Sequence, residues 1–78
     1  MIFNILFEFG NNARVANVSY SPKTDRYTIY FTDVELILEF GSKAEYSRQK
    51  GMKLLKQGSD SNDLVEAITR ELQVHMAA

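Results

Sequence analysis

The first half of the chain alternates between apolar and polar residues with a period of two. In IFNILFEF, residues 2–9, the four odd-numbered apolar side chains would share one face. Successive side chains of a β-strand point to opposite sides of the sheet, so this period is typical of a strand with one buried face. The segments at 14–20, 26–31 and 34–40 (RVANVSY, RYTIYF and VELILEF) follow the same rule. The pattern therefore predicts four strands.

Short polar segments separate these strands and have the composition of tight turns. Asn tolerates a positive φ angle, and Pro presets the first central position of a turn. The spacing predicts three consecutive hairpins. Their loops would lie at Asn11–Asn12, Pro22–Asp25 and Thr32–Asp33.

The pairing of the strands follows from the expected loop positions. The first loop would pair Phe7 with Ala16, the second Val18 with Ile29, and the third Ile29 with Leu36. All three hairpins keep one apolar face continuous, whereas a slip of one residue would turn an apolar set toward solvent. The residues expected to be buried against the helices are Phe7, Ile29, Leu36 and Leu38.

After Gly41 the pattern changes to one that favours helices. The SKAE segment at 42–45 is a capping box, in which a serine and a glutamate satisfy each other's backbone amides. We expect a first helix from Lys43 to about Gln57 with Gly58 as its C-cap, and a second from about Asn62 to Met76. The apolar stripe of the second helix would consist of Leu64, Val65, Ile68, Leu72 and Met76.

These elements predict one α+β domain spanning residues 1–78. The expected architecture is a four-stranded antiparallel β-meander with two C-terminal helices packed on one face, a ββββαα two-layer sandwich. A chain of 78 residues is small for a folded domain, but a hydrophobic content of 45% supplies enough apolar side chains for a core.

Basic residues concentrate in one segment of a chain whose net charge is −1. Residues 43–58 contain five Lys or Arg and a single acidic residue, Glu45. On the predicted first helix, most of these cations would lie opposite the apolar face and form a partner-binding surface. Such a face could bind an acidic protein surface or a nucleic-acid backbone, or it could simply be solvated. We favour a protein partner over nucleic acid, because a dedicated nucleic-acid binder is usually strongly basic and this chain has a pI near 5.7. The expected members of the face are Lys43, Tyr46, Lys50, Lys53 and Lys56.

The outer face of the predicted sheet is the second candidate surface. No part of the chain is left over to cover it, and it would carry apolar side chains between polar ones. The first strand has Glu8 as its only charge and lacks the usual protection against edge-to-edge pairing. This surface is expected to bind a partner or a second copy of the chain. Its apolar members would be Ile2, Leu6, Val15, Tyr30 and Ile37.

The residues of the chain do not form a recognisable catalytic set. The single histidine, His75, would lie near a helix end, where the helix dipole favours it. Metal sites typically need three or four converging ligands, and the chain has no cysteine. We expect no enzymatic activity, no cofactor and no metal. No segment reaches the roughly 20 apolar residues of a membrane-spanning helix, so we expect a soluble, cytoplasmic protein.

The combined pattern favours a small non-enzymatic interaction protein, such as a regulator, inhibitor or adaptor. It would bind another macromolecule through the basic helix face, the open sheet face or both. The alternative is a weak nucleic-acid-binding protein that uses the Lys-rich face.

Overall fold

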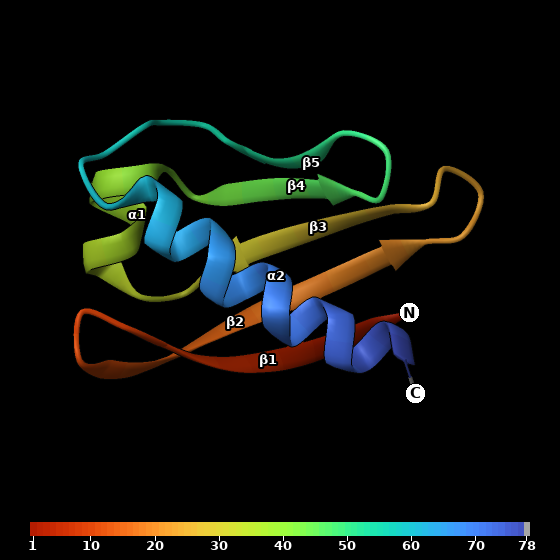
Figure 1. Cartoon of the computed structure of the whole chain (residues 1–78), viewed down its shortest axis with the longest axis horizontal. Coiled ribbons are helices and arrows are strands. Elements are labelled where there is room, and N and C mark those ends of the chain that lie inside the picture. The colour runs from red at the N-terminus through yellow and green to blue at the C-terminus, as the bar shows by residue number, and fades with distance from the viewer. Residues whose placement is uncertain (78) are drawn as a thin grey trace.

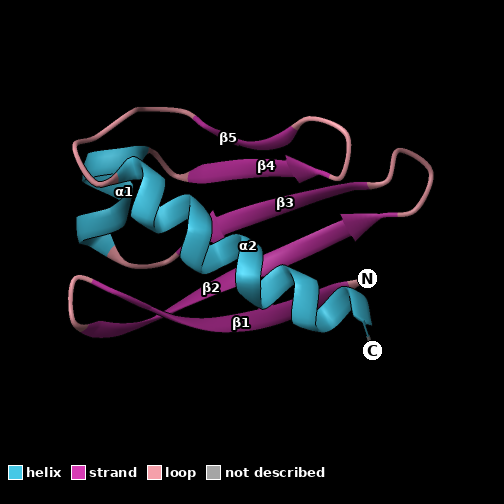
Figure 2. Cartoon of the chain, in the orientation of Figure 1, coloured by secondary structure: helices cyan, strands magenta, loops and turns pink. Residues whose placement is uncertain are grey.

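An antiparallel sheet of five strands forms one layer of the molecule, and the strands are ordered as they are in the chain. The structure is a computed structural model and describes residues 1–77. A long helix crosses one face of the sheet. A short helix lies at one end of the sheet and connects the third strand to the fourth (Figures 1 and 2). The elements are β1 (Ile2–Phe9), β2 (Asn12–Ser21), β3 (Arg26–Phe31), α1 (Val34–Phe40), β4 (Lys43–Ser47), β5 (Gly51–Leu54) and α2 (Ser61–Ala77).

The first three strands confirm the period-two prediction. Between β2 and β3 the register is also as predicted, with Val18 opposite Ile29. Between β1 and β2, Phe7 lies opposite Arg14 and not opposite Ala16. The turn here is formed by Gly10 and Asn11, which both have a φ angle of 63°. Two positive φ angles match the strand twist of a two-residue hairpin, and the shift of two residues leaves every side chain on its predicted face.

The segment predicted as the fourth strand is instead the helix α1. At its start, the side chain of Asp33 accepts a hydrogen bond from the backbone N–H of Glu35 at 3.0 Å. At its end, Gly41 has a φ angle of 98°, and its N–H donates to the carbonyl of Ile37 at 2.9 Å. An aspartate N-cap and a glycine C-cap are strong signals for helix ends, and here they outweigh the short alternation between them.

The helical period of α1 changes which of its apolar residues are buried. Leu36 and Phe40 are buried as a pair four residues apart, and Leu36 is 1% exposed. Leu38 was expected to be buried, but it is 71% exposed. The helix serves as the connection between β3 and β4, which pair antiparallel with Tyr30 opposite Lys43.

The predicted helix from Lys43 to Gln57 is also wrong, since this segment forms the hairpin of β4 and β5. The carbonyl of Ser42, the expected helix cap, accepts a hydrogen bond from the N–H of Phe31 at 3.0 Å and so continues the pairing with β3. Gly51 has a φ angle of 74° at the turn between the two strands. The inward-facing side chains of the hairpin alternate, as expected for strands: they are Ala44, Tyr46, Met52 and Leu54.

The helix α2 closes the core and confirms the predicted C-terminal helix. In Figure 1 it runs diagonally across the sheet from the α1 end toward the N-terminal end of β1. Leu64, Ile68 and Leu72 are completely buried at spacings of four residues. The molecule is thus an α+β two-layer structure with five strands and one helix packed across the sheet.

A buried arginine joins the sheet to α1. Arg14 lies on the inner face of β2, and its Nη1 atom is 2.6 Å from Oδ2 of Asp33. Its Nε atom donates to the carbonyl of Phe9 at 3.3 Å. The hydrogen bond from Arg14 lowers the pKa of Asp33, and the backbone N–H of Glu35 contributes to the same effect. Asp33 therefore caps the start of α1 and also forms an ion pair with Arg14 of β2.

Candidate functional site

The outer face of the sheet lies opposite α2 and carries exposed apolar and charged side chains. Its side chains come from alternate residues of all five strands, and most of them are exposed. We refer to it as the outer face. The pairing of the strands divides the outer face into an apolar half over β1 to β3 and a charged half over β4 and β5.

The apolar half brings together four of the five residues predicted for this surface. Leu6 lies directly opposite Val15 on the neighbouring strand, and Leu6 is 60% exposed. Ile2 is 79% exposed at the start of β1, and Tyr30 is 44% exposed on β3. Asparagine side chains lie between these residues, because Asn17 is paired with both Asn4 and Tyr30. Ile37, the fifth predicted member, is not on this face: it belongs to α1 and packs against the core.

The charged half places two of the predicted lysines together. Lys43 follows Tyr30 across the β3–β4 pair, and Lys53 lies directly opposite Glu45 across the β4–β5 pair. Oε2 of Glu45 is 3.8 Å from Nη1 of Arg26, so this carboxylate lies among three cations. The charged half is therefore predominantly positive and adjoins an exposed tyrosine.

Two shallow hollows lie in the charged half. One, of about 160 Å³, is lined by Lys43, Glu45 and Lys53 together with Leu55. The other, of about 180 Å³, lies between Glu45, Lys53 and the β4–β5 turn, where Lys50 contributes. Lysine stems with an apolar neighbour can pack against a partner while their ammonium groups remain at the rim.

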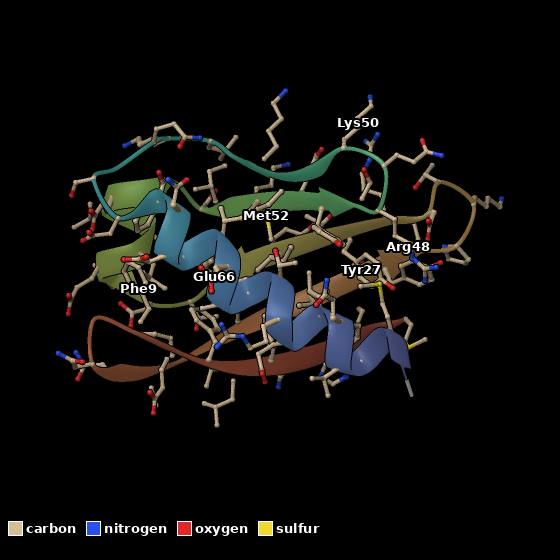
Figure 3. The ribbon with its side chains drawn as sticks, viewed as in Figure 1. Phe9, Tyr27, Arg48, Lys50, Met52 and Glu66 are labelled. Carbon is tan, nitrogen blue, oxygen red and sulfur yellow. The ribbon has the colours of Figure 1, made fainter. Side chains whose placement is uncertain are left out.

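The remaining basic-face predictions have different outcomes. Lys50 lies in the β4–β5 turn, and Figure 3 shows its side chain at the rim of the molecule. Lys56 follows β5, where its backbone N–H donates to the carbonyl of Phe40 at 3.0 Å. Tyr46 was expected on the basic surface, but it is buried on the inner face of β4. Because the segment is a hairpin, its even- and odd-numbered residues separate onto two faces and do not follow a helical wheel.

A further cavity, which the sequence did not indicate, lies on the inner side of the sheet, next to Met1 and the end of α2. It has a volume of about 280 Å³ and is lined mainly by aromatic side chains and the methionines at either end of the chain. The rings of Tyr20 and Tyr27 have centroids 4.5 Å apart, and those of Phe3 and His75 are also 4.5 Å apart. Arg48 completes the lining, next to Tyr27 in Figure 3.

Polar contacts hold the rim of this aromatic cavity. The hydroxyl of Tyr20 donates to Oδ1 of Asp25 at 3.0 Å, which together with burial raises the pKa of Tyr20. The hydroxyl of Tyr27 and the carboxylate of Asp25 raise the pKa of Arg48. The sequence predicts only the Tyr20–Tyr27 pairing, because Arg48 lies in the segment that the sequence pattern favours as a helix, and no pattern places His75 against Phe3.

Two further observations concern residues 1–77. In this part of the chain, no group of three or more His, Cys, Asp or Glu side chains is placed to hold a metal ion. Neither helix in this range combines the length and apolar character needed to cross a bilayer.

The arrangement of the outer face suits non-covalent binding of a macromolecule. It offers exposed apolar side chains beside a cluster of cations on neighbouring strands of one sheet. Compared with known proteins, the chain matches no family model, no curated protein and no solved structure.

Proposed function

We propose that this chain is a small non-enzymatic interaction protein, a regulator, inhibitor or adaptor that binds another protein through the outer face of its sheet. The observation that carries the proposal is the juxtaposition of an exposed apolar half with a positively charged half on one face of the sheet. Protein interfaces typically combine an apolar centre with a polar rim, and aromatic residues are enriched in them. Tyr30 lies at the boundary between the two halves and is the expected anchor.

The chemistry of the face indicates the chemistry of the partner. The apolar half fits a partner stripe of similar character, whereas Lys43 and Lys53 fit carboxylates at its flank. Opposite potentials across an interface speed up association and select against wrong partners. The proposed partner is therefore a protein surface with an apolar stripe bordered by acidic residues.

The test begins with affinity capture from native cell extract, with and without nuclease. Each recovered protein is then measured against purified variants by a surface-based kinetic assay at two salt concentrations. The double change Lys43→Glu and Lys53→Glu should slow association at least tenfold at low salt, because it places acidic groups opposite an acidic surface. The change Tyr30→Ala should mainly speed dissociation, as expected for an interface anchor.

The matched control is Lys23→Glu, an equivalent charge change in the β2–β3 turn and away from the outer face. It should leave both rates within about a factor of two. Partners that bind the outer-face variants and the control variant equally well would refute the proposal.

Single-stranded nucleic acid is a second candidate ligand, favoured by the pairing of Tyr30 with Lys43. An exposed aromatic ring can stack on a base while nearby cations follow the backbone. Three cations, Lys43, Lys53 and Arg26, would give a log–log salt slope of about −2 at roughly 0.7 per phosphate contact. The assay is fluorescence anisotropy with a labelled oligothymidylate, and Lys43→Gln with Lys53→Gln should flatten the slope. Absence of binding at low salt would exclude this candidate.

A further inference from the structure

Within residues 1–77, the strand β1 lies at the edge of the sheet and pairs only with β2. Its hydrogen-bonding pattern follows from the first pair, in which the N–H of Tyr20 donates to the carbonyl of Met1 at 2.8 Å and the amino group of Met1 donates to the carbonyl of Tyr20 at 3.3 Å. In an antiparallel ladder, such pairs recur at every second residue. The residues that turn their N–H and C=O groups toward β2 are Phe3, Ile5, Phe7 and Phe9. Those that turn them toward the open edge are Ile2, Asn4, Leu6 and Glu8.

This edge has few of the features by which proteins usually prevent edge-to-edge pairing. β1 is eight residues long and pairs with β2 without a bulge. The only proline of the chain is Pro22, outside β1, and the only charged residue in β1 is Glu8. Long, regular and weakly charged edge strands are templates for a further strand.

A groove runs beside the second half of this edge. It has a volume of about 320 Å³ and lies between β1 and one side of α2. The diagonal path of α2 in Figure 1 explains its position, because the helix approaches the N-terminal end of β1 and moves away from the C-terminal half. It is lined by Leu6, Phe7 and Glu8 from β1, by Ala13 from β2, and by Ala67, Arg70 and Glu71 from α2.

We propose that β1 pairs antiparallel with β1 of a second copy of this chain, with Leu6 on the two-fold axis. A symmetric dimer needs a surface that complements itself, and an antiparallel strand pair meets this condition. In the proposed register Leu6 lies opposite Leu6 of the second copy, and Asn4 lies opposite Glu8. Apolar thus meets apolar and polar meets polar, and the two Glu8 side chains lie at opposite ends of the pair.

The proposed register also uses the open backbone groups efficiently. Three pairs of residues whose backbone groups point toward the open edge would form about six hydrogen bonds, at two bonds per pair. The pairing would be centred where the groove lies, so that the second strand enters next to Ala67 and Arg70. The side chains of Leu6 and its neighbour Val15 would continue into those of the second copy as one apolar stripe. The two sheets would become continuous, and the two outer faces would lie side by side.

This inference is independent of the proposed partner, since it concerns the edge of the sheet and not the outer face as a docking surface. Sedimentation equilibrium of the purified chain should show a concentration-dependent approach to twice the chain mass of 8.9 kDa. The change Leu6→Lys should weaken dimerisation at least tenfold, because it places two ammonium groups together at the axis. The matched control is Val15→Lys, the same substitution on the same face but one strand further from the edge.

Backbone readouts separate edge pairing from other modes of association. Asn4→Pro removes an N–H that points away from β2, so the monomer should fold normally while the dimer weakens. Amide hydrogen exchange should show protection at Asn4, Leu6 and Glu8 that increases with protein concentration. The amides of Ile5 and Phe7, which point toward β2, should be protected from exchange at every concentration.

The absence of native cysteine allows the register to be tested directly. Leu6→Cys should form an intermolecular disulfide on mild oxidation, since paired Cα atoms about 5.5 Å apart suit this bond, whereas Val15→Cys should not. Circular dichroism of each variant confirms that it is folded. A chain that remains monomeric at millimolar concentration would overturn the proposal, as would equal weakening by Leu6→Lys and Val15→Lys, which would indicate face-to-face contact. Hydrogen exchange at the amides of Asn4, Leu6 and Glu8 that does not depend on protein concentration would also contradict the proposal.

Discussion

The same substitution at two leucines of α1 should have very different effects on stability. Leu36 is 1% exposed and Leu38 is 71% exposed, although they are two residues apart. Leu36→Ala removes three buried carbon atoms, which costs about 2.4 kcal/mol at roughly 0.8 kcal/mol per methylene. A residual cavity would add up to about 2 kcal/mol at roughly 24 cal/mol per Å³. The expected loss for Leu36→Ala is thus about 2.4–4.4 kcal/mol, whereas Leu38→Ala should stay within about 0.5 kcal/mol.

Such a loss is large for a small domain. At roughly 0.05–0.15 kcal/mol per residue, the free energy of unfolding of this chain should be about 4–12 kcal/mol. Urea unfolding followed by circular dichroism measures both variants, and an unchanged slope would show that only stability has changed. Thermal midpoints provide a second reading, with a drop of about 10 °C or more for Leu36→Ala. Equal losses at the two positions would refute the reasoning, because they would place both side chains on one strand face.

Two further predictions concern α1 and the turns of the hairpins. Asp33→Asn keeps an N-cap oxygen but removes the charge that pairs with Arg14. Folding lowers the pKa of Asp33, because Arg14 and the N–H of Glu35 donate hydrogen bonds to its carboxylate. The stabilisation of the fold by this charge is therefore present above the unfolded pKa of about 3.9 and is lost as the pH falls through the folded pKa. The stability difference between wild type and Asp33→Asn, measured by urea unfolding from pH 7 to pH 2, should therefore shrink toward acid; a difference that does not change with pH would contradict this assignment. Gly41→Ala should destabilise the protein more than Gly51→Ala in the same assay, because a Cβ at Gly41 would lie 2.7 Å from Cβ of Leu55, whereas one at Gly51 would meet no atom within 4 Å. The strained φ angle alone should cost about 1–2 kcal/mol at Gly51, and an equal loss at both glycines would exclude the predicted steric contribution at Gly41.

The first three strands and α2 could be predicted from the sequence because their periodicity is long and unambiguous. The register of β1 on β2 could not, since a shift of two residues preserves both faces and only the turn distinguishes the alternatives. The observed loop is Gly10–Asn11, one residue earlier than the expected Asn11–Asn12. Gly10 tolerates the required positive φ angle better than Asn12 would.

The segment from Val34 to Phe40 is too short for its period to decide between helix and strand. It has apolar residues at nearly every position, so it fits both patterns, and its caps at Asp33 and Gly41 were the better signal. For residues 43–57 the capping signal is misleading: the capping-box sequence favours a helix, but pairing with β3 determines the structure. Local propensity is a weak prior, and tertiary pairing overrides it.

The candidate surface could be predicted where it depended on the early strands. Ile2, Leu6, Val15 and Tyr30 lie on the outer face as expected, because the alternation there is correct. The lysines were predicted on the wrong element, yet two of them lie on the same outer face. Apart from the predicted pairing of Tyr20 with Tyr27, the aromatic cavity and the Arg14–Asp33 pair join residues that are distant in sequence, and no single-sequence pattern indicates such contacts.

The order of the strands in the sheet has a consequence for how the chain folds. Every strand pairs with its neighbour in sequence, so each step of sheet formation closes only a short loop. Folding rates rise as contacts become more local, which favours rapid formation of the meander. The packing of α2 against β1 differs, because it joins segments about 60 residues apart and must close nearly the whole chain. In any state of the folding chain in which the meander has formed and α2 has not docked, the inner face of the sheet would be exposed to water, and the chain would present apolar side chains on both faces of the sheet.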